Sequence, residues 1–172
     1  MERTLRLEPV PPEHPDLSRL IARLDVYLSG LYPPEEIFAV DFQNPSVQRM
    51  FFLVAYLGNE PVGCGAFKRL DDGCGELKRF YVEPGHRNQG IARALLERLE
   101  QAALGSGCSV MRLETGEPQT EAVGFYRKHG YLPIDRYGEY VDCPSSLCME
   151  KLLAASKAAR RAEAAEDRQA GA

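Results

Sequence analysis

The stretch GHRNQGIARALLERLE, from Gly85 to Glu100, decides the fold class. Ile91, Leu95 and Leu99 recur at four-residue intervals, which predicts an amphipathic helix with one apolar face. The start of this helix is unusual because no Ser, Thr or Asp is present to cap its first amide groups. The strand-like run 76–82 precedes it, and a strand followed by a glycine-containing turn and a helix can bind an anion at those free amides. The sequence therefore predicts an anion-binding turn at residues 87–92.

Two common phosphate-binding motifs do not account for this turn. The spacing Gly85-x4-Gly90 matches the glycines of a P-loop, but Ile91 and Ala92 occupy the positions of its Lys and Ser/Thr. The dinucleotide motif GxGxxG is missing here, and the Gly-Cys-Gly of residues 63–65 lies inside a predicted strand with no helix after it. From these residues alone, a tight turn without a ligand remains the alternative to phosphate binding.

The rest of the chain predicts an α+β (mixed α/β) fold with helices on both faces of a sheet. An apolar face between a cap at Asp16 and a stop at Gly30 predicts the first helix, and Gln119–His129 predicts the last. Alternating or β-rich runs predict strands at 4–10, 51–57, 61–70, 76–82, 109–115, 131–137 and 145–153. We expect one domain over residues 1–153, followed by a polar, Ala- and charge-rich tail over 154–172.

Composition narrows the classes of function. The net charge of −4 argues against a nucleic-acid partner, because phosphate neutralisation needs a basic surface. Five cysteines without a CxxC pair predict no metal site and no disulfide framework. The longest apolar run, residues 50–57, is too short to span a membrane, and the first ten residues lack the apolar core of a signal peptide. We therefore expect a cytoplasmic protein without a membrane partner.

The sequence resembles the GNAT (Gcn5-related) N-acetyltransferases in two motifs that occur in the family's order. Arg87-Asn88-Gln89-Gly90-Ile91-Ala92 matches the signature Gln/Arg-x-x-Gly-x-Gly/Ala. The segment 119–126, QTEAVGFY, followed by Lys128-His129-Gly130-Tyr131, resembles the second motif, with Gln119 in place of the common Asn. The resemblance covers roughly residues 4 to 153. It implies a mostly antiparallel, twisted sheet that is splayed between its fourth and fifth strands.

The resemblance implies acetyl-CoA as the cofactor, with its pyrophosphate on the amides of Gln89 to Ala92 and Arg87 nearby. The pantetheine arm is expected to pair with the exposed backbone of Phe80, Tyr81 and Val82, like an added strand. The full set of expected cofactor-binding residues is Phe80, Tyr81, Val82, Arg87, Asn88, Gln89, Gly90, Ile91, Ala92, Arg93 and Gln119.

The resemblance also implies two catalytic residues for direct attack of an amine on the thioester in a ternary complex. Tyr126 matches the family's general-acid tyrosine, and a core tyrosine is its alternative role. Glu76 stands eleven residues before Arg87, where the family's histone acetyltransferases carry their base; an ordinary strand carboxylate is the alternative. Strand alternation predicts Glu76 on the same face as Lys78, Phe80 and Val82, with Glu83 and Glu114 as reserve bases.

The acceptor is expected to be the primary amine of a small or amino-acid-like molecule, bound by Tyr27, Tyr32, Glu35 and Tyr137 in the variable segments. The alternatives are a protein or peptide N-acetyltransferase and a non-catalytic module that binds acyl-CoA. A homodimer and a monomer both fit the sequence, which does not identify the acceptor or the acyl chain.

Overall fold

The computed structural model describes residues 2–70 and 73–153. The predicted tail, 154–172, lies outside the described residues. Within the part of the chain that is described, no helix combines the length and the apolar character needed to cross a membrane.

Within residues 2–70 and 73–153, seven strands form a single sheet in the order β1-β2-β3-β4-β5-β7-β6. Every neighbouring pair is antiparallel except β4 and β5, which are parallel. The predicted α+β class is therefore confirmed. The strands are β1 (Leu5–Val10), β2 (Phe51–Leu57), β3 (Glu60–Arg69), β4 (Cys74–Val82), β5 (Val110–Gly116), β6 (Leu132–Ile134) and β7 (Ser146–Leu152).

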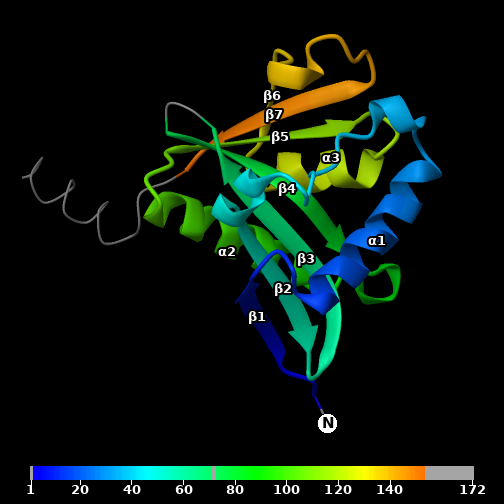
Figure 1. Ribbon diagram of the computed structural model, residues 1–172, viewed down its shortest axis with the longest axis vertical. Helices are drawn as coiled ribbons and strands as arrows, with labels where there is room; N and C mark the ends of the chain where they lie inside the picture. The colour runs from blue at the N-terminus through cyan, green and yellow to red at the C-terminus, as the bar shows by residue number, and fades with distance from the viewer. Residues whose placement is uncertain (1, 71–72, 154–172) are drawn as a thin grey trace, which may run out of the picture.

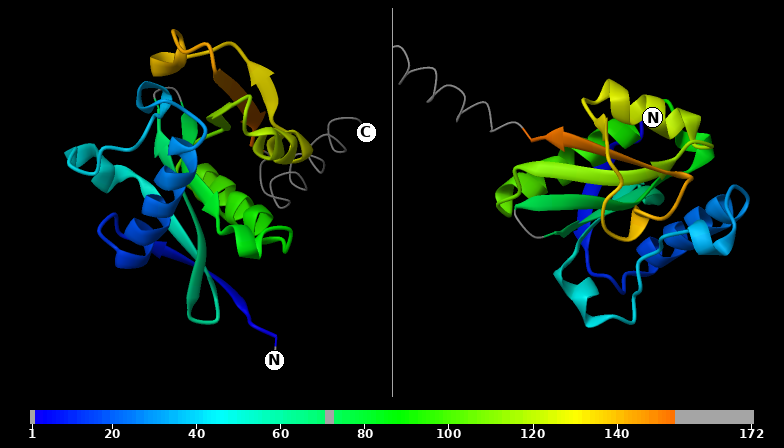
Figure 2. Two further views of the ribbon diagram at one scale, coloured as in Figure 1. Left: turned by 90° about the vertical axis from the view of Figure 1, so that its right-hand side faces the viewer. Right: turned by 90° about the horizontal axis from the view of Figure 1, so that it is seen from above.

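Among the described residues, three α-helices cover the two faces of this sheet, as Figures 1 and 2 show. Helix α1 (Pro15–Ser29) places Leu17, Leu20 and Leu24 in a core on one face. Helices α2 (Ile91–Gly105) and α3 (Thr120–Lys128) belong to the core on the other face, which also contains Tyr126. Helices α1 and α2 bury the apolar stripes that their sequence periods predict, and the buried side chain of α3 is Tyr126.

Strands β4 and β5 separate soon after they meet, and Figure 1 shows them diverging from a shared end. Their pairing comprises Cys74–Val110, Gly75–Met111 and Glu76–Arg112 and does not continue. The rest of β4, from residue 77 to 82, has backbone partners on its β3 side. This splay matches the one implied by the family resemblance, and it opens a space between the two strands.

A bulge in β4 changes which side chains face which side of the sheet. Cys64 of β3 pairs with Tyr81 and Ala66 pairs with Lys78, so β4 has one residue more than β3 at this point. Arg79 has a positive φ of 53°, as expected for an irregular position. The predicted alternation from Glu76 to Val82 is therefore wrong: Val82 packs in the core under α2, and Glu76 lies on the opposite face with Lys78.

Three local predictions also need correction. Helix α1 is capped by His14, whose Nδ1 accepts from the Asp16 amide, so Asp16 is not the cap. The strand predicted over 131–137 is shortened to the three residues of β6. The prolines at 33, 34 and 45 predict a loop with one short helix after the first helix, but this segment contains two 3₁₀ helices, η1 (Pro34–Glu36) and η2 (Pro45–Arg49). Two more, η3 (Pro84–His86) and η4 (Gly138–Tyr140), lie later in the chain.

Candidate active site

The turn before α2 has the geometry of an anion-binding site. Gly90 is the N-cap in the left-handed conformation, with φ 81°, and no side chain caps the helix. Asn88 also has a positive φ, of 60°. A Cβ built on Gly90 meets no atom within 4 Å, so the backbone is open to a ligand at this point. The first amides of α2 are thus free for an anion, which the helix dipole also favours.

Around this turn, the side chain of Arg87 lies against the end of β4, whereas the neighbouring polar side chains are exposed to solvent. Arg87 folds back, with its Nε donating to the Val82 carbonyl at 3.0 Å and its guanidinium 5.6 Å from the centre of the Tyr27 ring. Asn88 and Gln89 are exposed. Arg93 forms an exposed ion pair with Glu97 one turn along α2. Arg87 is therefore the cation that lies between the turn and the end of β4.

The end of β4 presents its aromatic residues to opposite faces. Phe80 stacks on Phe125 of α3 with ring centroids 5.9 Å apart, and it lies 6.1 Å from the Tyr126 ring. Tyr81 packs in the core under α1 instead. Because β5 has already diverged, the β5 side of Phe80 to Val82 is the edge at which an extended ligand could pair with backbone.

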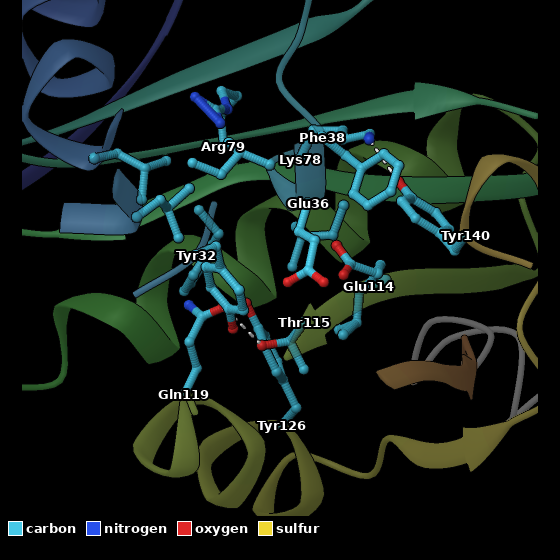
Figure 3. A pocket seen from close by; sticks show the side chains of 16 residues that line it. Tyr32, Glu36, Phe38, Lys78, Arg79, Glu114, Thr115, Gln119, Tyr126 and Tyr140 are labelled. Carbon is cyan, nitrogen blue, oxygen red and sulfur yellow. Dashed lines mark hydrogen bonds between the residues drawn. The ribbon is translucent and has the colours of Figure 1, made fainter. Parts of the chain in front are cut away.

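A cavity of about 100 Å³ lies where β4 and β5 have separated. It is closed by the end of α1, the segment after α1, α3 and the loop that carries η4, and Figure 3 shows its side chains from close by. The residues that line it are Leu24, Leu28, Tyr32, Glu36, Ile37, Phe38, Leu77, Lys78, Arg79, Phe80, Leu113, Glu114, Thr115, Gln119, Tyr126 and Tyr140.

Tyr126 is the tyrosine of α3 that reaches this cavity. Its side chain is 7% exposed and packs between Phe80, Phe125 and Tyr131. Burial raises the pKa of its hydroxyl above the usual value of 10. Tyr126 therefore holds its proton at neutral pH, as a residue that is to donate a proton must.

Glu114, a reserve candidate in the sequence, lines the same cavity from β5. Its Oε1 accepts a hydrogen bond from the Ser146 hydroxyl at 2.8 Å. Burial raises the pKa of its carboxyl from 4.5 to about 7, and the nearby ammonium of Lys78 opposes this shift. The carboxyl thus titrates close to neutral pH, which suits a general base.

Glu76, the first candidate for the base, lies outside the residues that line the cavity. It is 2% exposed, and its Oε1 is 3.3 Å from Lys78 Nζ and 3.5 Å from Lys68 Nζ. Tyr137 donates a hydrogen bond to its Oε2. Both oxygens of Glu76 are therefore engaged, and Tyr137 acts as its partner away from the cavity.

Tyr32 reaches the cavity from the segment after α1. Its hydroxyl donates to Gln119 Oε1 at 2.9 Å, and Thr115 Oγ1 lies 3.4 Å from the same oxygen. A Cβ on Gly116 would lie 1.9 Å from the Tyr32 hydroxyl, so the glycine makes this approach possible. Gln119, expected at the cofactor, therefore also connects α3 to the wall of the cavity.

Of the four residues predicted to bind the acceptor, Tyr32 is the one that lines the cavity. Tyr27 lies beside Arg87, and Glu35 is exposed on η1. Sequence reasoning pointed to Tyr140, which does line the cavity, but it missed Glu36, Phe38 and Lys78 as lining residues. The tyrosine- and carboxylate-rich segments did indicate the right regions, but they left the orientation of each side chain open.

No metal site accompanies the cavity. Across residues 2–70 and 73–153, no three His, Cys, Asp or Glu side chains are grouped so as to hold a metal ion. The five cysteines are buried and unpaired.

Comparison with protein families gives one match that spans most of the described chain. The model of the acetyltransferase (GNAT) family matches residues 17–131. An IAA acetyltransferase of Azospirillum brasilense is 42% identical over 136 residues, which are 78% of this chain and 89% of that protein. YjcF of Bacillus subtilis, an uncharacterised N-acetyltransferase, is 37% identical over 59% of this chain and 75% of its own.

Solved structures share the fold over nearly the whole described chain. A Klebsiella pneumoniae protein described as an acyl-CoA N-acyltransferase superposes with a TM-score of 0.77 at 32% identity, covering 88% of this chain and 99% of its own. The PaiA N-acetyltransferase of Thermoplasma acidophilum, solved in complex with coenzyme A, gives a TM-score of 0.65 at 22% identity, covering 87% and 99%. The second likeness shows the fold alone.

Proposed function

Because the chain belongs to the acetyltransferase (GNAT) family, we propose that it transfers the acetyl group of acetyl-CoA to the primary amine of a small molecule in the cavity between β4 and β5. The observation that carries the proposal is the pairing of Glu114 and Tyr126 in one cavity, a carboxyl that titrates near neutral pH and a phenol that stays protonated. The carboxylate suits removal of a proton from the attacking ammonium, and the phenol suits donation of a proton to the leaving sulfur.

The chain's own groups for holding acetyl-CoA are the free amides at the start of α2 and the unpaired edge of β4. Residues 89–92 receive the pyrophosphate, with Arg87 beside them, and the edge formed by residues 80–82 takes the extended arm. Gln119 stands at the junction with the cavity. Asn88 and Arg93 flank this site without buried contacts. Bound acetyl-CoA supplies the activated acetyl group.

We assign the general base to Glu114. An alkyl ammonium with a pKa of about 10.4 must lose a proton before its nitrogen can attack a thioester. Glu114 faces the cavity and has one hydroxyl partner, whereas Glu76 is covered by two ammonium groups and a phenol. In this assignment Glu76 positions Lys78 at the cavity wall.

Tyr126 is the general acid in this proposal. Its hydroxyl holds a proton for the leaving sulfur, and the aromatic side chains around it fix the direction of the ring. A Tyr126→Phe variant keeps this packing and removes only the hydroxyl. We expect it to bind acetyl-CoA normally and to lose roughly 10²–10³-fold in kcat. CoA release and acetyl-CoA titration on the same preparation measure both quantities, and full activity in Tyr126→Phe would exclude it as the acid.

The size of the cavity favours a small acceptor over a protein. A volume of about 100 Å³ lined by Tyr32, Phe38 and Tyr140 accommodates a short amine. The acceptor that gives the Azospirillum relative its name, IAA, supports the small-molecule class. A panel of small amines and peptides, scored by CoA release, tests the choice. Exclusive use of peptides would replace the small-molecule acceptor, and acetyl-CoA binding without turnover would favour a non-catalytic module.

A further inference from the structure

The charged groups that line the cavity are two cations and two carboxylates, and their partners differ. Lys78 Nζ is 3.3 Å from Glu76 and 3.5 Å from Glu139, and it donates to the Tyr140 hydroxyl at 2.6 Å. Arg79 forms an ion pair with Asp25 of α1. Both cations are thus compensated by carboxylates.

The two carboxylates of the cavity lack such compensation. Glu36 accepts from the Ser145 hydroxyl at 3.0 Å, and Glu114 accepts from Ser146 at 2.8 Å. Among residues 2–70 and 73–153, neither carboxylate has a Lys, Arg or His nitrogen within 4.0 Å. The pKa of Tyr32 is raised to about 12, mainly by burial and in part by the negative charges of these two carboxylates. The negative charge of Glu36, and that of Glu114 when it is ionised, is therefore not paired with a cation at contact distance, although the more distant Lys78 ammonium acts on Glu114.

The aromatic walls suit the same kind of ligand. Phe38 and Tyr140 meet edge to face with centroids 4.8 Å apart, and Tyr32 stands on another side of the cavity (Figure 3). Tyr140 already has the Lys78 ammonium 5.3 Å from its ring centre. Aromatic faces combined with a carboxylate form an environment that stabilises an ammonium group.

We infer that the acceptor carries a second cationic group besides the amine that is acetylated, and that Glu36 binds it while Glu114 faces the reacting nitrogen. This inference rests on the proposed function and names its substrate class as a short diamine or a related dication. An acceptor with a carboxylate at the same position meets like charge from Glu36 and finds Lys78 and Arg79 already paired.

A matched set of acceptors tests the inference. The set is 1,4-diaminobutane, n-butylamine and 4-aminobutyrate, which share a chain length and differ in the charge at the far end; the same set is repeated with six carbons. For the wild-type chain we expect kcat/KM to be about tenfold higher for the diamine than for the alkylamine, after correction for its two amines, and lowest for the amino acid. In Glu36→Gln the ratio of diamine to alkylamine falls to about one.

Glu35→Gln is the control, because Glu35 is the neighbouring exposed carboxylate of η1 and does not line the cavity. It should keep the tenfold ratio. The inference is overturned if the wild-type chain prefers butylamine or aminobutyrate, or if Glu36→Gln retains the wild-type ratio. Either result leaves the acetyltransferase itself intact. Failure of all acceptors with a chain that binds acetyl-CoA overturns the proposed function as well. The kcat/KM ratios of the wild-type chain can overturn the inference without any variant, so the test still decides if Glu36→Gln folds poorly.

Discussion

Glu114 must be ionised to act as a base, but its ionisation lowers the stability of the folded chain. Its pKa in the folded chain is about 7 instead of 4.5, because burial disfavours the charged form. Between these two pH values the unfolded chain releases a proton that the folded chain keeps. The contribution of Glu114 to stability is therefore present below pH ~4.5 and is lost as pH rises through 7, at a cost on the order of 3 kcal/mol.

We expect Glu114→Gln to become less active and more stable. The amide keeps an acceptor for Ser146 and does not titrate, so the variant escapes the cost of ionisation above pH 7. Urea unfolding should show a gain of about 2–3 kcal/mol at pH 8 that shrinks towards pH 5. Over the same range wild-type kcat/KM should fall about tenfold per pH unit below 7, as expected for one essential base. An equal change in stability at both pH values would exclude a raised pKa for Glu114.

Gly65 tests how closely β3 packs against α2 and Phe80 near the bulge. A Cβ on Gly65 of β3 would lie 2.7 Å from Leu99 Cδ1 and 3.1 Å from Phe80, and Leu99 is fully buried. Gly65→Ala should therefore lose about 1–3 kcal/mol. Gly124→Ala is the matched control, because a Cβ in that exposed turn of α3 meets nothing within 4 Å and should gain about 0.5–1 kcal/mol. Denaturant midpoints measure both, and a Gly65→Ala chain as stable as wild type would contradict the close packing.

The turn before α2 makes a prediction about acetyl-CoA affinity. Gly90→Ala places a side chain at a φ of 81°, which costs about 1 kcal/mol in backbone strain and puts a methyl group where the backbone is open. We expect calorimetry to show acetyl-CoA binding weakened at least fivefold. Gly85→Ala is the control, since Gly85 has no positive φ and no neighbour within 4 Å. Equal acetyl-CoA affinities for Gly90→Ala and wild type would show that this turn is not part of the acetyl-CoA binding site.

Over the whole molecule, the sequence predicted the elements better than the site. Apolar periods of 3.6 and 2 residues locate α1, α2 and the long strands, because these elements bury one face over many residues. The strand predicted over 131–137 was too long, since the three residues of β6 are too few to set a pattern that marks where it ends. The two motifs around Gln89 and Tyr126 supplied the family and with it the splay of β4 and β5.

The site was predicted less well because two local irregularities and the burial of one carboxyl build it. The bulge at Arg79 reverses the facing of β4, so alternation placed Glu76 beside Phe80 and Val82 although they lie on opposite faces. Glu36 and Phe38 come from a segment without regular period, whose side-chain directions depend on η1. Glu114 stood out only when its burial beside the cavity was known.

The central claim is that the acetyl group of acetyl-CoA is transferred to an amine in the cavity between β4 and β5. The most direct measurement incubates the chain with acetyl-CoA and 1,4-diaminobutane at pH 8, and follows free CoA and acetylated amine together by mass spectrometry. The account predicts one acetylated amine for each CoA released, and strongly reduced turnover in both Glu114→Gln and Tyr126→Phe. Turnover that persists unchanged in the two variants, or acetyl-CoA binding with no acetylated product from any amine, would contradict it.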